Sequence, residues 1–146
     1  MMSNEITKSV PVDAPESEVF KALTDERELV RRMAKSAEMD AREGGEYQLT
    51  FRSAARNTET IARGRIVELV PDRKLSYTYA SNEDEPCVPP SLLTWNLGRS
   101  PDGKTLVTVV HSGFRGDPYR EILACGYYLE RLSAHCSRAA SGVVKR

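Results

Sequence analysis

The chain has no excess of charge of either sign and no long apolar run. Its 146 residues include 21 Lys plus Arg and 21 Asp plus Glu, so its formal net charge is zero. Broad non-specific binding of DNA or RNA needs a positive surface, and this balance argues against it. No apolar run approaches the roughly 20 residues of a membrane span. The start Met1–Glu5 has neither a basic region nor an apolar signal core, so we expect a cytoplasmic protein.

Cysteine and histidine are scarce as well. The three cysteines, Cys87, Cys125 and Cys136, show no regular spacing. On one helix Cys125 and Cys136 would be roughly 16 Å apart, too far for a disulfide, so we expect three reduced thiols. The two histidines are His111 and His135, and no Cys-x-x-Cys, His-Glu-x-x-His or Gly-x-Ser-x-Gly motif is present. We therefore expect no metal, no cofactor and no serine nucleophile at a known motif.

Apolar periodicity predicts an α+β domain that spans residues 1–146, with a core at about 4–140. Strands are expected at 6–12, 46–52, 58–70, 75–79, 93–97 and 105–112, with a possible bulge near Gly64. Two short helices are expected, one with Pro15 at its first helical position and one that starts at Thr24–Asp25, and a long helix is expected from about 117 to 140. Turns are expected at 44–45, 71–74 and 100–104. Because the strands alternate and the C-terminal helix is the longest element, that helix should cover one face of the sheet.

The predicted long helix has small residues along its expected buried line. Ile122, Gly126, Leu129, Ser133, Cys136 and Ala140 align at about 100° per residue, with Leu123 and Leu132 on the flanks and His135 on the outer face. A helical glycine costs roughly 1 kcal/mol relative to alanine. Close packing against the sheet would explain it, and so would a cavity. The facing strands carry aromatic and polar-tipped side chains, which favours a ligand cavity.

Several stretches, in order, resemble a known superfamily. They are Ala14–Asp25, Gly44–Tyr47, Gly64–Glu68, Pro71–Leu75, Thr105–Phe114 and Gly126–Leu129. The chain is identified as a member of the START-related, helix-grip (SRPBCC) superfamily. More narrowly, it is similar to bacterial homologues of the C-terminal domain of the heat-shock-protein-90 ATPase activator.

The resemblance implies a helix-grip fold. In that fold a curved antiparallel sheet of about six to seven strands wraps around a long C-terminal helix, two short helices follow the first strand, and an internal cavity is present. Relatives often have tryptophan where this chain has Phe20, Met33 and Tyr127, so one end of the pocket should have a different shape here. The residues expected to line the pocket are Phe20, Met33, Tyr47, Leu49, Phe51, Tyr77, Tyr79, Leu93, Trp95, Val109, His111, Phe114, Leu123, Gly126 and Tyr127.

His111 is the most distinctive of these residues. It ends the segment Val109–Phe114, and Ser112 should point to the opposite face of the strand. A pocket-lining histidine and a hydrogen-bonded core histidine both fit the pattern. Arg27, Arg31, Arg32 and Lys35 form a basic cluster that could attract an anionic ligand or an acidic partner, although a solvated face is favoured. Glu68 could be a buried general base, but an outward-pointing, solvated side chain is favoured.

Three functions remain open. The first is binding of a hydrophobic or aromatic small molecule between the sheet and the C-terminal helix. The second is a protein-interaction module with a chaperone partner, as the resemblance implies. The third is a cyclase-like or hydrolase-like enzyme that uses the same pocket, although no catalytic residue is assigned. A homodimer is an additional expectation.

Overall fold

The computed structural model describes residues 5–32, 34–53, 58–82, 90–114, 126 and 128–137. The expectations for Met33, Leu123 and Tyr127 lie outside these residues. So do those for Cys87 and Cys125 and for the start of the long helix near 117.

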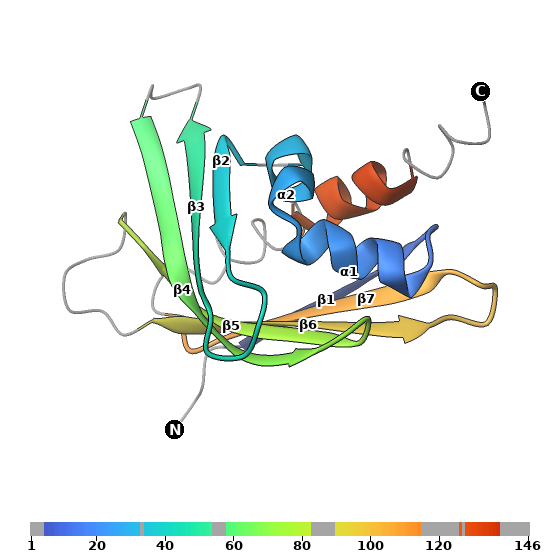
Figure 1. Ribbon diagram of the computed structural model, residues 1–146. Coiled ribbons are helices and arrows are strands. Elements are labelled where there is room, and N and C mark those ends of the chain that lie inside the picture. The colour runs from blue at the N-terminus through green and yellow to red at the C-terminus, as the bar shows by residue number, and fades with distance from the viewer. Residues whose placement is uncertain are drawn as a thin grey trace.

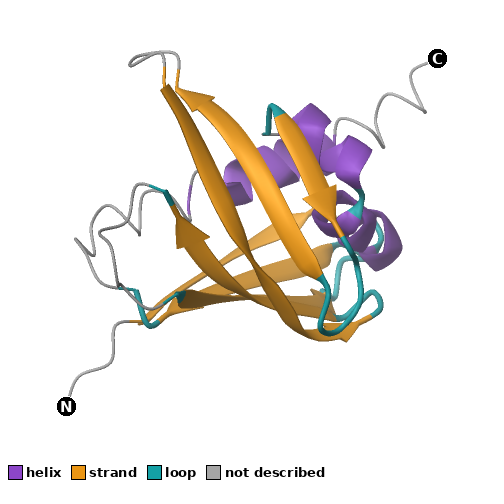
Figure 2. Ribbon diagram, turned by 60° about the vertical axis from the view of Figure 1, so that its left-hand side comes forward, coloured by secondary structure: helices purple, strands orange, loops and turns teal. Residues whose placement is uncertain are grey.

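Seven strands form one antiparallel sheet in the order β1-β7-β6-β5-β4-β3-β2. The strands are β1 (Glu5–Val12), β2 (Ser36–Met39), β3 (Glu46–Ser53), β4 (Thr58–Val70), β5 (Lys74–Ser81), β6 (Ser91–Arg99) and β7 (Thr105–Ser112). The sheet is strongly curved, and β2, β3 and β4 rise steeply away from β1, β6 and β7 (Figures 1 and 2). This confirms the predicted α+β class with a curved antiparallel sheet.

The helices all lie on the concave side of the sheet (Figure 2). They are α1 (Glu16–Thr24), α2 (Glu26–Arg32) and a C-terminal helix whose described part covers 128–137. Asp25 begins α2 as predicted, because its Oδ1 accepts hydrogen bonds from the backbone N–H groups of Arg27 at 2.9 Å and Glu28 at 3.2 Å. Pro15 lies one residue before α1, at the N-cap position.

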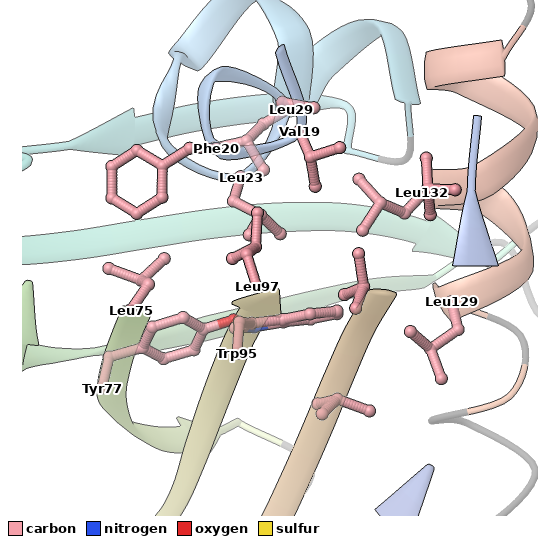
Figure 3. Packing of buried hydrophobic residues seen from close by; sticks show 14 of the residues in the cluster. Val19, Phe20, Leu23, Leu29, Leu75, Tyr77, Trp95, Leu97, Leu129 and Leu132 are labelled. Atoms are coloured by element: carbon pink, nitrogen blue, oxygen red, sulfur yellow. The ribbon is translucent and has the colours of Figure 1, made fainter. Parts of the chain in front are cut away.

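The core lies between α1, the C-terminal helix and the inner face of the sheet. Val19, Phe20 and Leu23 of α1 point toward the side chains of the sheet (Figure 3). Leu75 and Leu97 are among the sheet residues that face them, and both are buried. Burial of each such side chain contributes about 1.5–3 kcal/mol, so this packing fixes α1 over β5 and β6.

The C-terminal helix is rotated relative to the prediction. Leu132 is fully buried, with Leu129 and Cys136 beside it, whereas Gly126 and Ser133 are half-buried. The buried line therefore runs through Leu129, Leu132 and Cys136. The prediction that places Leu132 on a flank is wrong, because packing against both α1 and the sheet sets the rotation of this helix.

Three further details differ from the sequence-based expectations. The four-residue strand β2 lacks β-branched residues and was not predicted. The apolar pattern of α2 places Val30 with Leu29 on the buried side of the helix, but Val30 is 44% exposed. The register shift in β4 lies between Ile66 and Glu68, slightly beyond the predicted bulge at Gly64. The predicted turns are confirmed, with positive φ at Gly44, Asp72 and Gly103.

Candidate functional site

The central part of the inner face is a solid aromatic cluster made of Tyr47, Tyr77 and Trp95, from β3, β5 and β6. The rings of Tyr47 and Tyr77 meet edge-on, with centroids 4.8 Å apart. Trp95 Nε1–H donates to Tyr77 Oη at 2.9 Å, and Tyr47 Oη–H donates to the Thr78 carbonyl at 2.8 Å. Burial raises the pKa of Tyr47 far above its ordinary value. The polar groups of this cluster therefore link β5 to β3 and to β6 through hydrogen bonds.

A second part of the inner face is less tightly covered. Phe51, Tyr79 and Leu93 contact the core but remain half-buried, in contrast to the aromatic cluster. Tyr128 of the C-terminal helix faces Phe51, with ring centroids 6.2 Å apart. This surface combines apolar and aromatic side chains from β3, β5 and β6 with one from the helix above them.

His111 lies at the edge of this less covered surface. It is opposite Leu93 in the β6–β7 ladder and is 4% exposed. Its ring approaches those of Phe114 at 5.0 Å and Tyr79 at 6.2 Å. Its Nε2 lies 2.8 Å from Ser91 Oγ. Burial lowers the pKa of His111 below its ordinary 6.5, so the ring is neutral at pH 7.

The sequence-based reasoning missed Ser91, which is the hydroxyl beside His111. Ser91 is 8% exposed, and its Oγ also donates a long hydrogen bond of 3.4 Å to the Tyr79 carbonyl. If the Ser91 hydroxyl donates to Tyr79, the N–H of His111 lies on Nε2. Extending the alternation of Leu93 and Trp95 backward by two residues places Ser91 on the inner face. The pairing with His111, however, needs the register of β6 and β7, which the sequence does not contain. Ser112 lies on the opposite face of β7 and is half-buried.

The predicted pocket residues differ in how far they are buried. Phe51, Tyr79 and Leu93 form the less covered surface, and the buried His111 and Phe114 lie beside it. The other placed residues with large side chains are part of the packed core, namely Phe20, Tyr47, Leu49, Tyr77, Trp95 and Val109. Gly126 is half-buried, and no atom of the described residues lies within 4 Å of the position that a Cβ would take. Close packing against the described part of the sheet is therefore not the reason for this glycine. Met33, Leu123 and Tyr127 lie outside the described residues.

The remaining predictions concern metals and charges. Among the described residues, no group of three His, Cys, Asp or Glu side chains is arranged to hold a metal ion. Arg27, Arg31 and Lys35 are exposed, in keeping with a solvated face. Glu68 is 45% exposed and pairs with Lys74 at 3.0 Å. Cys136 is a buried thiol.

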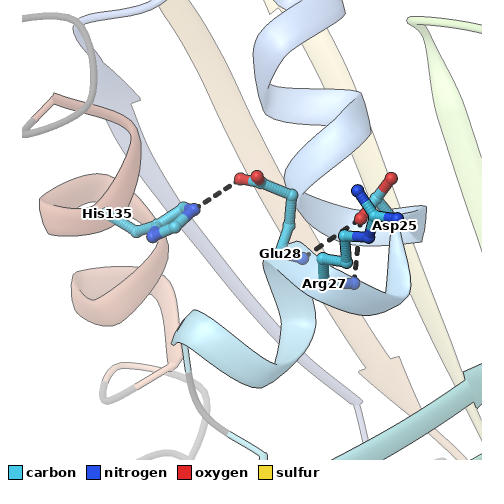
Figure 4. Close-up of polar contacts among 4 residues, drawn as sticks. All are labelled: Asp25, Arg27, Glu28 and His135. Carbon is cyan, nitrogen blue, oxygen red and sulfur yellow. Dashed lines mark hydrogen bonds and ion pairs between the residues drawn. The ribbon is translucent and has the colours of Figure 1, made fainter.

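His135 contradicts the prediction that it lies on the outer face of the helix. Its side chain is 15% exposed, and its Nε2 lies 2.7 Å from Oε1 of Glu28 on α2 (Figure 4). The prediction from helical periodicity considered burial of this helix against the sheet alone. Because α2 packs against another side of the same helix, that side is also partly buried.

A polar hollow of about 490 Å³ opens on the outer face of the sheet. Most of its lining side chains alternate along β3 and β4 with the buried Leu49 and Ala62, which places them on the solvent side; the buried Tyr47 also borders it. Arg65 and Glu46 form an ion pair of 3.0 Å across it. The lining residues are Glu38, Glu46, Tyr47, Gln48, Arg63, Gly64, Arg65 and Thr78. The hollow is separate from the inner surface described above.

Comparison with known proteins gives one family. The family model described as "Activator of Hsp90 ATPase homolog 1-like protein" matches residues 13–135. No curated protein sequence matches the chain. None of the described helices is long and apolar enough to cross a membrane.

Solved structures with the same fold include three that match at least 90% of this chain. Protein CV1439 from Chromobacterium violaceum is 24% identical, with a TM-score of 0.79, over 92% of this chain and 98% of that one. CalU16 from Micromonospora echinospora is 22% identical, with a TM-score of 0.71, over 90% and 73% of the two chains. The Aha1 dimer from Colwellia psychrerythraea is 16% identical, with a TM-score of 0.74, over 94% and 97%. These likenesses establish the helix-grip fold.

Proposed function

The chain belongs to the Activator of Hsp90 ATPase homolog 1-like protein family, and on this premise we propose that it is a small-molecule-binding protein. Its ligand is a hydrophobic or aromatic molecule held between the sheet and the C-terminal helix. The observation that carries the proposal is the half-exposed apolar surface of Phe51, Tyr79 and Leu93 beside the buried His111. A concave apolar wall with few polar groups is the usual form of a small-molecule site.

The contrast within the inner face supports this location. The Tyr47, Tyr77 and Trp95 cluster is buried, and its polar tips bond to one another or to the backbone. Phe51, Tyr79 and Leu93 are inward-facing but only partly covered, so they retain apolar surface that a ligand would bury. In this proposal the core cluster supports the site and the half-exposed residues contact the ligand.

The polar group of the site is His111. Its Ser91 partner holds one ring nitrogen at 2.8 Å, which fixes the ring against Tyr79 and Phe114. A neutral imidazole and the hydroxyl of Tyr79 would orient the ligand, and Phe114 would close one end. Met33, Leu123, Gly126 and Tyr127 complete the proposed lining.

A pair of adjacent leucines provides a matched test. Leu93 is on the inner face, whereas Leu92 is on the outer face and 36% exposed. The neutral fluorescent probe N-phenyl-1-naphthylamine would be titrated into the wild type and into the Leu93→Gln and Leu92→Gln variants. We expect saturable binding that Leu93→Gln weakens roughly tenfold, equivalent to about 1.4 kcal/mol, and that Leu92→Gln leaves unchanged.

Two results would argue against the proposal. One is the absence of saturable binding by the wild type. The other is an equal loss of affinity in both leucine variants, which would place the probe on a general apolar surface. Circular dichroism of each variant distinguishes loss of the site from loss of the fold.

Interaction with a chaperone is a second candidate function, and the family description favours it. In this reading the chain would bind an Hsp90-type chaperone and raise its ATPase rate. Adding the purified chain to the chaperone of its own host tests the idea directly. An unchanged ATPase rate together with no co-sedimentation would remove this function.

A homodimer is also proposed, because the solved relative from Colwellia psychrerythraea is described as a dimer. The sheet has two edge strands, β1 and β2, at which a second copy can be placed. Sedimentation equilibrium over a range of concentrations tests this directly. A single monomeric mass throughout would contradict it.

A further inference from the structure

Lys8 is a charged residue on the apolar inner face of the sheet. On β1, Ile6, Lys8, Val10 and Val12 alternate with outward-facing exposed residues, and Ile6 and Val12 are buried. Lys8 pairs with the buried Val109 of β7 and is itself half-buried. Its four-carbon stem therefore crosses apolar surface, as long cationic side chains commonly do.

The ammonium group of Lys8 has no hydrogen bond or ion pair with any of the described residues. Other polar tips on the inner side are held within the protein. Thr105 Oγ1, for example, donates to the Ala14 carbonyl at 2.6 Å, and His111 is held by Ser91. Of the described lysines, Lys35 pairs with Glu59 and Lys74 pairs with Glu68. Lys21 and Lys104 also lack an ion pair with the described residues, but they lie on α1 and in the turn before β7, so Lys8 is the described lysine without an ion pair on the inner face. A half-buried cation without a counter-charge is unfavourable, and an anionic group would offset that cost.

Lys8 lies beside the proposed site. His111 pairs with Ile6 and Val109 pairs with Lys8, so Lys8 and His111 are diagonal neighbours on one face of β1 and β7. Diagonal neighbours are roughly 7–8 Å apart, a distance that a lysine side chain can span. An anion next to His111 is therefore within reach of the Lys8 ammonium.

We propose that Lys8 binds the acidic group of the ligand, so that the natural ligand is an apolar molecule with a carboxylate. The carboxylate pairs with the Lys8 ammonium near His111, and the apolar part lies on Leu93, Tyr79 and Phe51. This inference rests on the proposed function and narrows it to one class of ligand. A cation on a solvent-shielded wall favours an acid over its neutral ester.

An inward-pointing charge on an edge strand has another known use. It discourages edge-to-edge pairing with a second chain, and β1 is an edge of this sheet. The two roles differ in their consequences, because edge protection does not distinguish an acid from its ester.

The test uses cis-parinaric acid and its methyl ester, which share one fluorescent chain and differ in charge. Both would be titrated into the wild type and into Lys8→Met, Lys8→Arg and Lys21→Met, where Lys21 is an exposed lysine of α1. We expect the wild type to bind the acid roughly tenfold more tightly than the ester, as one ion pair of about 1.4 kcal/mol would give. Lys8→Met should abolish this preference by weakening acid binding alone. Lys8→Arg and Lys21→Met should retain it.

Equal affinity of the wild type for acid and ester would overturn the inference and leave the proposed function standing. So would an unchanged preference in Lys8→Met, or an equal loss of affinity for both probes. If Lys8→Met forms larger species on size exclusion and its acid preference is intact, edge protection is the role of this lysine. Failure of both probes, and of the neutral naphthylamine, to bind the wild type would remove the proposed function together with this inference.

Discussion

His135 on the C-terminal helix is hydrogen-bonded to Glu28 on α2, with 2.7 Å between Nε2 and Oε1. The two residues are 107 positions apart in the chain. Their side chains are only 15% and 21% exposed, so the contact is partly shielded from solvent. It joins the described part of the C-terminal helix to α2.

This pair should contribute measurably to stability. A double-mutant cycle of Glu28→Ala and His135→Ala, measured by urea unfolding at pH 7, should give a coupling free energy of about 1 kcal/mol. The Lys74–Glu68 pair, with side chains 37% and 45% exposed, provides the control and should give about 0.3 kcal/mol. Equal coupling in the two pairs would show that the shielding at His135 has no effect.

The hydrogen bond between Trp95 and Tyr77 leads to a second prediction. Tyr77→Phe removes the acceptor of a buried indole N–H, and an unsatisfied buried donor costs about 1–3 kcal/mol. In a Trp95→Phe background the same change should cost less, because the donor is gone. Urea unfolding followed by circular dichroism checks both. The same loss in both backgrounds would mean that Tyr77 acts through packing alone.

Stability should fall in mild acid because of His111. Burial lowers the pKa of this ring in the folded state below its ordinary 6.5, so the unfolded state takes up a proton first as the pH decreases. The free energy of unfolding is then greatest above about pH 6.5 and decreases below it. Urea midpoints at pH 7.5 and pH 5.5 should differ less in His111→Gln than in the wild type. A His135→Gln control should retain the His111 part of this loss. A decrease that is undiminished in His111→Gln would contradict the assignment.

Substitution of alanine for glycine should change the stability of the protein very differently at three positions. A Cβ at Gly64 would lie 1.9 Å from the Thr78 carbonyl oxygen, whereas none of the described atoms lies within 4 Å of that position at Gly98 or Gly126. Gly64→Ala should therefore cost about 2–3 kcal/mol, because backbone has to move. Gly126→Ala should stabilise its helix by roughly 1 kcal/mol, and Gly98→Ala should be nearly neutral. Thermal unfolding of the three variants tests this prediction. Unchanged stability of Gly64→Ala would contradict it.

Local sequence patterns predict much of the fold. The strands at 58–70 and 105–112 have the predicted bounds, because alternation and turn residues are both local signals. The cap at Asp25 and the left-handed Gly103 also follow from nearest neighbours. Strand β2 was missed, since four residues without β-branched side chains give too short a pattern.

The site was predictable only in part. Period-two alternation places Tyr79, Leu93 and His111 on the inner face, as observed. It does not show that Tyr77 and Trp95 satisfy one another, or that Ser91 holds His111, because both depend on the pairing register of strands far apart in sequence. Likewise, helical periodicity places Leu129 and Cys136 together, but only tertiary packing decides that Leu132 is central and that His135 meets Glu28.

The central claim is that the less covered surface of Phe51, Tyr79 and Leu93 binds an apolar molecule. The most direct measurement is a set of intermolecular nuclear Overhauser effects between bound N-phenyl-1-naphthylamine and the isotope-labelled wild-type protein. The account predicts contacts from the probe to the methyl groups of Leu93 and to the rings of Tyr79 and Phe51. Contacts to the outward-facing Leu92 and Leu106 in their place, or no contacts at saturating probe, would contradict it.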